Sequence, residues 1–554
     1  MLFAQTYLEP EAGGEGMDQC IEFTKPGSAP FDISLAPSPV EPAQIPSGTV
    51  VGEIQYSRYP IFNANDPKED NQLFSLVDWL HIDTKKRILR DQILFAPGDV
   101  YEPRVVEESA RILREADYLY DARIWPYQLC GNRVDMEVVT REVWTLYAGG
   151  SLSRSGGNDK TSLYVTDANF LGRGETLSVE YKSTTDRDGW QLGYIDNSVV
   201  GSRHRLELFY ADNSDGSQTD VVVERPFYSL NSHNAWGVAY HDVEREDDLF
   251  ERGEEVATFQ TYKQSARAYW GLSNGWVDGK TQRWWLGVNT QLEEYEPLSG
   301  DFSASGIPQN REVNYPFIST EKIHESFIKV NNLNQMHRIE DFNLGVTWSA
   351  LLGVADKSFG SDEDRLVLDL YYRDAWMLSD HTLMQLESSI NGFWRYDEDI
   401  SDEVQVALSW RYYNGVYKKH GTYFAADARY ARNLPGSEQI LVGSDERLRG
   451  YPSRYQEGDR SVVFTAEHRY YTDWHILRIF RVGAAAFLDV GRAWETGDRN
   501  DGATGWLSDA GFGLRIASSR AQSKSILHID IAFPFNRPDD VDRYQVVVEA
   551  KTSF

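Results

Sequence analysis

The sequence lacks the long apolar run that a membrane-spanning helix requires. No stretch of eighteen consecutive residues in the 554-residue chain is apolar, although 41% of the residues are hydrophobic. A helix needs about 20 mostly apolar residues to cross the hydrocarbon core of a bilayer. Helical membrane spans are therefore excluded. A β-barrel is not, because only every second residue of a barrel strand faces lipid.

Positive charge is also scarce. The chain has 55 Lys and Arg residues against 85 Asp and Glu residues, which gives a formal net charge of -30. Proteins that bind nucleic acid neutralise phosphates with clustered Lys and Arg. The composition therefore argues against a nucleic-acid partner.

Only two cysteines are present, Cys20 and Cys130. So few thiols are compatible with an oxidising compartment, but the sequence leaves open whether the two residues pair. The residues before Cys20, Gly16 to Gln19, lack the small and apolar pattern of a lipoprotein anchor. The start at Met1 has no charged region or full apolar core of a signal peptide, so we expect it to lie inside the true signal, with Ala4 near the cleavage site.

Aromatic residues are plentiful, with 16 Trp and 31 Tyr. Such numbers suit the aromatic girdles that flank the lipid-facing band of a membrane barrel. A large soluble β-protein rich in aromatics has the same composition, so this feature alone does not decide between the two.

The last thirteen residues, from Asp542 to Phe554, alternate in character. One face carries Tyr544, Val546, Val548, Ala550, Thr552 and Phe554, and the other carries Arg543, Gln545, Glu549, Lys551 and Ser553. A strand between lipid and a wet lumen needs this period of two. An edge strand of a soluble sheet is the alternative. A terminal aromatic residue is common in the closing strand of bacterial outer-membrane barrels, so we predict that Phe554 is an assembly signal and an interface anchor.

Beyond Leu146 the chain contains short β segments separated by Asp, Asn, Gly and Ser turns, which predicts an antiparallel meander. Dividing the region among sixteen strands gives about 25 residues for each strand and its connection, as membrane barrels require. We expect a 16-stranded antiparallel transmembrane β-barrel over residues 147–554. Acidic stretches such as Asp242 to Glu255 are expected to be outward loops.

The first part of the chain has a different pattern. Residues 1–47 are rich in Pro and Gly and predict an extended arm. Residues 48–146 predict a strand, helical stretches and then two strands, an α+β domain large enough to bury its own core. The helical stretches are Asn71 to Ile82, Asp83 to Leu94 with Asp83 as N-cap, and one that begins at Pro103. This order resembles a POTRA domain, the periplasmic module of outer-membrane assembly barrels, with Asn65 to Leu80 as an insertion.

A motif near the end of the chain carries a second resemblance. Leu448-Arg449-Gly450-Tyr451-Pro452 precedes the strand Ser461 to Tyr471 and the run Phe487-Leu488-Asp489-Val490-Gly491. The combination resembles the outer-membrane assembly and translocation superfamily that includes BamA, TamA and the two-partner secretion transporters, the bacterial surface antigen family. The resemblance implies that Arg449, Gly450 and Tyr451 form the tip of a loop folded into the barrel. It also implies that Arg449 meets Asp489. Leu448 stands where the family usually has Val.

The residues fit this arrangement on physical grounds as well. Asp489 points into the lumen if Leu488 and Val490 face lipid, and by the same count Glu467 lies on the inner face of the preceding strand. Arginine suits the contact because its planar fork binds carboxylates in a bidentate manner and keeps its charge when desolvated. Arg469 is a nearer competitor for Glu467. In the plainer interpretation Arg449 is an ordinary surface-loop residue and Asp489 an acid close to a turn.

Enzyme signals are weak. Gly271-Leu272-Ser273-Asn274-Gly275 has the spacing of a hydrolase nucleophile turn, but no helix follows it, so we interpret it as a hairpin turn. No metal, calcium or phosphate-binding motif is complete. We expect no enzymatic activity, no catalytic residue and no cofactor.

Together these features predict a protein of the bacterial outer membrane with one POTRA-like domain in the periplasm. The resemblance implies that it assists the insertion or translocation of polypeptides. Its expected partners are outer-membrane lipid and an unfolded polypeptide client, bound through the POTRA-like domain by β-augmentation. The family usually has several such domains, so a passive or structural barrel with a lipid or small-solute role is the alternative.

Overall fold

The computed structural model describes residues 20–23, 44–63, 65–155, 158–184, 186–251, 254–300, 309–395, 400–434, 438–495, 505–521 and 525–551. The chain divides into two compact units, each described here by itself. Unit 1 contains residues 1–59, 92–114 and 121–141, and unit 2 contains residues 60–91, 115–120 and 142–554. The expected domain limits at residues 47 and 146 remain a prediction. Residues 60–91, in the expected POTRA-like region, belong to the unit that contains the barrel.

Unit 1 is built on a four-stranded sheet in the order β1-β3-β4-β2. Its strands are β1 (Cys20–Glu22), β2 (Val50–Tyr59), β3 (Leu119–Cys130) and β4 (Arg133–Glu142), and its helix is α3 (Pro103–Glu115). The predicted order of strand, helices and two closing strands is observed. The core combines apolar residues of α3 with those of β3 and β4, namely Val106, Ala110, Leu113, Ala122, Ile124, Val134, Met136 and Val138.

Strand β1 is an addition that the sequence pattern did not predict. It pairs antiparallel with the end of β3, where Cys20 lies opposite Cys130, and a disulfide joins these two residues. The pairing continues one residue further, because Phe23 N donates to Tyr127 O at 2.9 Å. One edge of the sheet is thus covered at this end by the chain's own N-terminal arm.

Two short helices complete the region before the barrel. Helix α1 (Gln72–Leu80) has Asn71 as its N-cap, whose side chain accepts a hydrogen bond from Phe74 N at 3.0 Å. Helix α2 (Lys86–Gln92) begins three residues after Asp83, so the predicted cap at Asp83 is wrong. In the part of the chain that the structure describes, no helix has the length and apolarity to cross a membrane.

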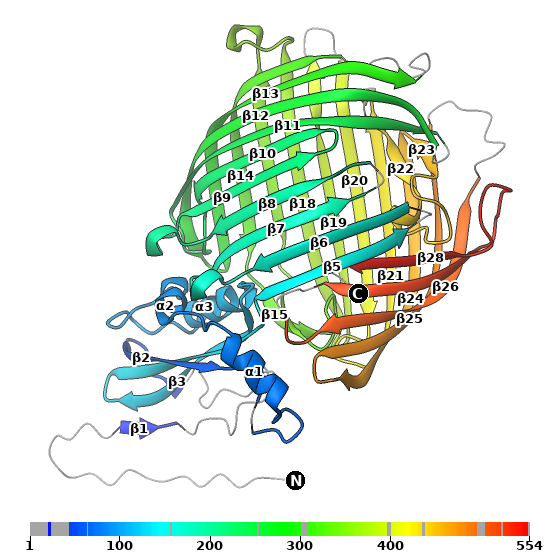
Figure 1. Cartoon of the computed structure of the whole chain (residues 1–554). Helices are drawn as coiled ribbons and strands as arrows, with labels where there is room; N and C mark the ends of the chain where they lie inside the picture. Colours follow the sequence, from blue (N-terminus) through cyan, green and yellow to red (C-terminus); the bar gives the residue numbers. More distant parts are fainter. Residues whose placement is uncertain are drawn as a thin grey trace, which may run out of the picture. The chain divides into compact units, whose positions relative to one another are not determined.

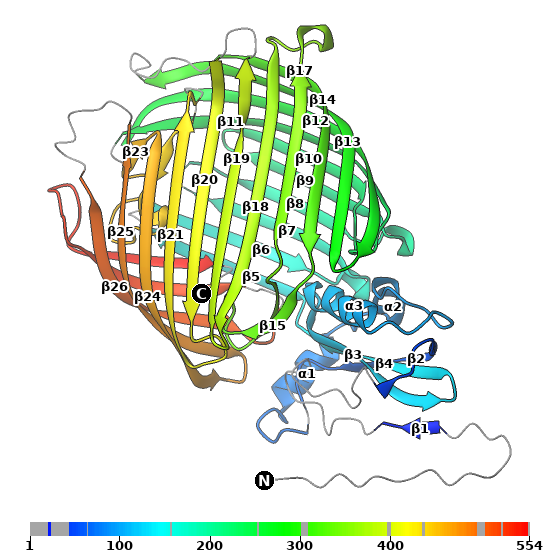
Figure 2. The ribbon, with the colours of Figure 1, turned by 180° about the vertical axis from the view of Figure 1, so that it is seen from behind.

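The rest of unit 2 is a closed antiparallel barrel (Figures 1 and 2). Its strands are β5 (Leu146–Ser155), β6 (Asn158–Asp167), β7 (Glu175–Ser183), β8 (Asp188–Asp196), β9 (Arg205–Asn213), β10 (Gly216–Arg225), β11 (Asn234–Glu251), β12 (Glu254–Val277), β13 (Lys280–Gly300), β14 (Arg311–His324), β17 (Thr347–Ala355), β18 (Arg365–Ser379), β19 (Thr382–Arg395), β20 (Ile400–Asn414), β21 (His420–Arg432), β24 (Arg460–Ile476), β25 (Phe480–Trp494), β26 (Leu507–Ser518), β27 (Ile526–Pro534) and β28 (Gln545–Lys551). We call the end where β5 starts the proximal end and the opposite end the distal end.

A transmembrane β-barrel was predicted correctly, but the described residues form twenty barrel strands rather than sixteen. The difference arises because several early strands are short. Strands β7 to β10 contain only nine or ten residues each, and β9 and β10 are joined by a tight turn. An average of 25 residues for a strand and its connection was therefore too long.

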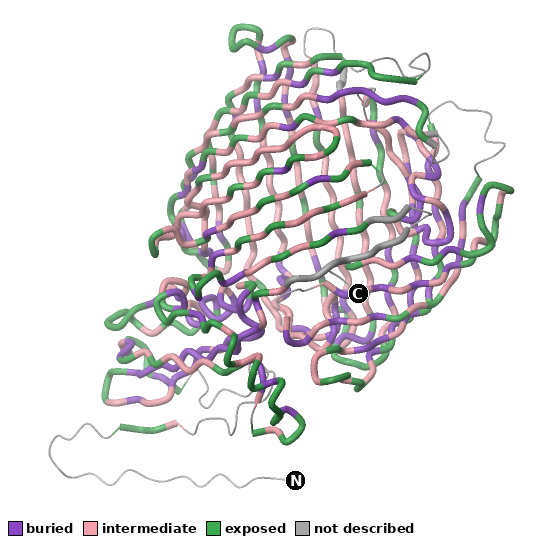
Figure 3. The backbone as a smooth tube through the Cα atoms, viewed as in Figure 1, coloured by how far each residue is buried: buried purple, intermediate pink, exposed green. Residues whose placement is uncertain are grey.

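The strand faces follow the expected alternation (Figure 3). On β25 the side chains of Phe487 and Asp489 are buried, whereas Leu488 between them is exposed on the outside. On β13 the exposed series is Trp284, Leu286 and Val288. An apolar outer face with polar residues inside is the pattern of a membrane barrel.

Two local predictions were wrong. Asp242 to Glu251 is the second half of β11 and not a loop, because its residues pair in register with β12. Gly271 to Gly275 lies within β12, where the register with β13 shifts between Ser273 and Trp276, so it is a bulged strand end and not a hairpin turn.

Candidate functional site

The long connection between β21 and β24 folds back into the barrel from the distal end. It contains strand β22 (Ile440–Val442), the short helix η6 (Ser444–Glu446) and strand β23 (Gln456–Gly458), and the two strands pair with each other. We call residues 438–459 the lumen loop. Its apolar residues form a buried cluster with residues of the barrel wall and of the β27–β28 connection, namely Val442, Leu448, Tyr451, Tyr455, Val463, Ala493, Leu507 and Val541.

Arg449, near the tip of the lumen loop, contacts three carboxylates of the barrel wall. Its guanidinium donates to both oxygens of Asp489, from Nε to Oδ2 at 2.8 Å and from Nη2 to Oδ1 at 3.1 Å. Nη1 donates to Glu467 and to Asp530, each at 3.2 Å. The guanidinium carbon also lies 3.3 Å from the centre of the Phe487 ring. Asp489 is 0% exposed and Arg449 5%, so the bidentate pair is shielded from water.

The same carboxylates bind further cations of the wall. Glu467 accepts a hydrogen bond from Arg469 Nε at 2.9 Å, and Asp530 pairs with Arg515. Thr465 donates to Asp489 Oδ1 at 2.8 Å. Every one of these ionic groups is buried, and each has an oppositely charged neighbour, as a low-dielectric site requires. Arg449 thus completes a buried ionic network that spans β24, β25, β26 and β27.

Gly450 and Tyr451 explain the rest of the tip motif. A Cβ atom at Gly450 would lie 2.6 Å from the Cβ of Asp509 on β26, so only glycine permits this close approach. The Tyr451 ring is fully buried, and its hydroxyl lies 3.1 Å from Ser508 O and 2.9 Å from Asn536 O. Tyr451 therefore fixes the tip against the β27–β28 connection.

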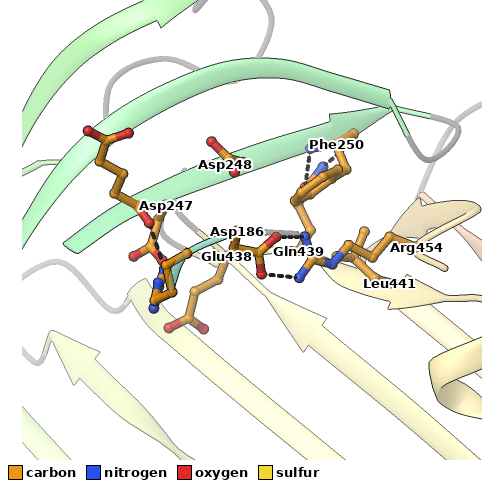
Figure 4. Close-up of a pocket in the computed structure, with 10 residues that line it drawn as sticks. Asp186, Asp247, Asp248, Phe250, Glu438, Gln439, Leu441 and Arg454 are labelled. Carbon is orange, nitrogen blue, oxygen red and sulfur yellow. Dashed lines mark hydrogen bonds and ion pairs between the residues drawn. The ribbon is translucent and has the colours of Figure 1, made fainter. Parts of the chain in front are cut away.

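The base of the lumen loop borders a cavity of about 340 Å³ at the distal end (Figure 4). Arg454 forms a bidentate pair with Asp186, at 3.1 and 2.8 Å, and stacks on Phe250. The Gln439 side chain exchanges two hydrogen bonds with the Phe250 backbone, at 3.0 and 2.9 Å. Most of the remaining lining residues are acidic, namely Glu246, Asp247, Asp248 and Glu438. These contacts tie the loop to the opposite wall.

A second segment enters the lumen from the proximal end. Between β14 and β17 the chain forms a hairpin of β15 (Phe327–Asn331) and β16 (Ile339–Asn343), which we call the lumen hairpin. Three backbone N–H groups of its tip, from Leu333, Asn334 and Gln335, donate to the Glu340 carboxylate at 3.0 to 3.2 Å. Burial raises the pKa of this carboxyl. Glu340 therefore organises the tip from within.

The lumen hairpin and the lumen loop meet the same network. Arg469, which binds Glu467, also donates from Nη1 to Leu333 O at 3.1 Å. Tyr471 donates to Asn332 O at 3.1 Å, and Met336 packs in a cluster with Tyr471 and Ile526. Glu467 is thus bound on one side by the loop's Arg449 and on the other by Arg469, which contacts the hairpin.

The structure therefore brings together Arg449, Asp489 and Glu467, with Gly450 and Tyr451 beside them. Phe554 lies outside the described residues. Sequence reasoning missed Asp530 and the lumen hairpin. A signal for Asp530 exists, because it is a lone acid between Ile529 and Ile531 in a mostly apolar strand. The hairpin has only the polar run Asn331-Asn332-Leu333-Asn334-Gln335 between two short β segments.

The fold and the site together define a class of protein. It is the antiparallel membrane barrel whose lumen holds a loop with an arginine near its tip. Residues 348–553 match the model of the Omp85 superfamily domain. The matched region begins within β17 and includes the lumen loop and all three carboxylates bound by Arg449. This match agrees with the predicted resemblance to that superfamily over this part of the chain.

Solved structures that match the chain include BamA from Haemophilus ducreyi lacking POTRA domains 1–3, with 12% identity over 90% of this chain and 84% of that chain and a TM-score of 0.39. CdiB from Acinetobacter baumannii shares 10% identity over 90% and 73% of the two chains, with a TM-score of 0.41. CdiB from Escherichia coli shares 14% identity over 90% and 76%, with a TM-score of 0.44. No curated protein matches the sequence.

Replacing Arg449 with Ala should strongly destabilise the folded barrel. The substitution leaves the buried carboxylates of Asp489, Glu467 and Asp530 with less compensating charge, which typically costs about 3 to 5 kcal/mol. The measurement is the urea concentration at which half of the protein loses the heat-modifiable, folded form on gels. Arg447→Ala is the matched control, because Arg447 pairs with the partly exposed Asp427 and should matter by at most about 1 kcal/mol. Equal midpoints for the two variants would contradict a structural role for Arg449.

Stability should also depend on pH through Glu446 of the lumen loop. Burial, reinforced by the neighbouring Asp445 carboxylate, raises the pKa of Glu446 to about 7. The folded state therefore binds the carboxyl proton of Glu446 more tightly than the unfolded state does. The contribution of this proton to the free energy of unfolding is fully present near pH 4 and is lost as the pH rises through 7.

Glu446→Gln should therefore match the wild type near pH 4 and exceed it at pH 8 by about 1 to 3 kcal/mol. Urea midpoints measured across this pH range check the prediction. Asp445→Asn should reduce the pH dependence of the urea midpoint only in part. The Asp445 charge raises the pKa of Glu446 less than burial does. A wild-type slope unchanged in Glu446→Gln would show that other groups set the pH dependence.

Proposed function

We propose that this protein, without enzymatic activity of its own, assists the insertion or translocation of polypeptides at the bacterial outer membrane. In this role unit 1 lies in the periplasm and binds an extended client, and the barrel opens between its first and last strands. The pairing at that seam is the observation that carries the proposal.

The seam between β5 and β28 is the weakest junction of the barrel among the described residues. There only Val548 of β28 is in register with a residue of β5, Arg154. On its other side β28 pairs with β27 along its length, from Ile526–Lys551 to Ala532–Gln545. Gly149 and Gly150 on β5 favour weak pairing further, because glycine contributes no side chain to a strand. Among the described residues this junction has the fewest ladder pairs, and fewer ladder hydrogen bonds lower the cost of opening.

Unit 1 offers a way to hold a client. The end of strand β3 already pairs with an extended segment, β1, through Cys20–Cys130, Ile21–Leu129 and Glu22–Gln128, and in the part of the chain that the structure describes β1 covers only these three residues of β3. This pairing supports recognition by β-augmentation, in which main-chain hydrogen bonds to an exposed edge bind an extended peptide. The disulfide keeps the arm on that edge, where it competes with a client.

A disulfide across the seam should abolish the activity. Residues directly opposite in an antiparallel pair have Cβ atoms about 5 Å apart, so Arg154→Cys with Val548→Cys should crosslink on oxidation. The measurement is the folding of a urea-denatured small outer-membrane barrel into proteoliposomes that contain the variant. We expect loss of at least about 90% of the stimulated folding when opening is required, since each 1.4 kcal/mol added to a barrier slows it tenfold.

The matched control joins Val548→Cys to the other neighbour through Ile529→Cys, at a junction that is already fully paired. This crosslink should leave the activity unchanged, and the wild type treated with the same oxidant and reductant controls for the native disulfide. A gene deletion gives the cellular test. If outer-membrane and secreted protein inventories stay unchanged in the deletion strain, the protein is a passive barrel.

Freeing the β3 edge should strengthen client binding. Cys20→Ser with Cys130→Ser releases the tethered competitor, so the affinity for a fluorescent extended peptide from an outer-membrane strand should rise up to about tenfold, or 1.4 kcal/mol. Fluorescence anisotropy with the full chain in detergent measures this affinity. Reduction of the wild type should reproduce the gain, and an affinity insensitive to both treatments would place the client elsewhere.

A further inference from the structure

Helix α1 of unit 2 exposes an apolar face that no described residue covers. Trp79 is 78% exposed, Leu73 62%, Leu80 54% and Leu76 49%, and these positions fall on one side of the helix. The other side is buried through Phe74. In Figure 3 the helix, placed as in Figure 1, is drawn mostly in the exposed colour. A nine-residue helix with apolar residues on both sides is unusual for a segment in water.

The helix is fixed to the proximal end of the barrel through its buried side. The Phe74 ring stacks on Phe62 at 4.0 Å between centroids, and both pack in a cluster that includes Ile479 of the β24–β25 turn. Arg520 of the β26–β27 turn donates to Ile61 O at 2.6 Å and pairs with Glu69, with its guanidinium over Phe62. Arg478 pairs with Asp66 at 3.3 Å.

The β24–β25 turn of the barrel is itself apolar on its outer side. Leu477 is 71% exposed and Trp474 67%, and Ile476 and Phe480 are exposed as well. These residues continue the outer apolar face of β24 and β25, the face that meets lipid in a membrane barrel. Ile479, between Leu477 and Phe480, packs against the cluster that contains Phe74, so helix α1 lies beside this turn at the edge of the lipid-facing surface.

We propose that helix α1 lies in the lipid–water interface beside the proximal end of strands β24 and β25, with Leu73, Leu76, Trp79 and Leu80 in contact with the membrane. Short amphipathic helices bind in this way with their apolar face about 5 to 10 Å deep, and Trp is favoured at that level. The exposed face carries no charge. The one acid of the helix, Asp78, turns away and accepts a hydrogen bond from Phe62 N at 3.3 Å.

Continuity with the barrel's outer face argues for lipid over other occupants. A second copy or a soluble partner would have to cover α1 while leaving room for the bilayer around the neighbouring turn. Lipid covers both surfaces at once. The inference depends on the barrel fold and not on the proposed function.

The test places an environment-sensitive fluorophore on α1 in the full-length protein. Leu76→Cys is labelled without reduction, so that the native disulfide stays closed, and the protein is reconstituted in phosphatidylcholine nanodiscs with and without brominated lipid. Ser75→Cys is the matched control, because Ser75 is exposed on the same helix but off the apolar side. We expect bromine to quench the Leu76 probe at least about twofold more than the Ser75 probe.

Trp79→Glu added to Leu76→Cys should reduce the quenching by at least about half, since a charge at this position opposes burial in the interface. Because Trp79 is exposed, the heat-modifiable barrel should be unaffected. Quenching no stronger at position 76 than at position 75 would overturn the proposal. The proposal would also be overturned if the probe in detergent became more protected as the protein concentration increased. That result would assign the apolar face to a second copy of the chain.

Discussion

The arrangement of the lumen depends on one guanidinium. Arg449 reaches the wall from a loop that enters at the distal end and binds Asp489, Glu467 and Asp530, which lie on three different strands. None of these carboxylates is accessible to water, so each requires a cation nearby. The loop therefore does more than fill space. It supplies the cation that the buried Asp489 binds and adds to Arg469 and Arg515 around Glu467 and Asp530, and in return these acids fix the position of the loop.

The need for such inserts follows from the size of the barrel. Side chains fill the interior of a barrel of about eight strands, whereas barrels of sixteen or more leave a channel. The twenty strands described here enclose more space than side chains can occupy. Two segments fill part of it, the lumen loop from the distal end and the lumen hairpin from the proximal end. Apolar clusters around Tyr451 and around Leu333 show that both are packed against the wall.

The sequence predicted the features that depend on the local alternation of apolar and polar residues or on a specific motif. Alternation along β25 placed Asp489 in the lumen, and the motifs around Arg449 and Asp489 carried the resemblance that implied their contact. It could not predict the number of strands, because strand length varies from seven residues in β28 to 24 in β12 and no local rule sets it. It also missed β1, whose three residues carry no period, and the lumen hairpin, whose stability comes from tertiary contacts of Asn332 and Leu333 with Tyr471 and Arg469.

The two inserts are physically connected through Glu467. One oxygen of this carboxylate lies near Arg449 of the lumen loop and the other binds Arg469, which in turn holds the backbone of the lumen hairpin. Withdrawal of the loop would leave Glu467 to Arg469 and Arg515 alone, and withdrawal of the hairpin would remove a hydrogen-bond acceptor from Arg469. Both changes act on the buried Glu467–Arg469 pair, the first by removing a cation from Glu467 and the second by removing an acceptor from Arg469, so their free energies should be coupled. Two segments that enter the lumen from opposite ends and are linked through the Glu467–Arg469 pair should therefore leave it cooperatively.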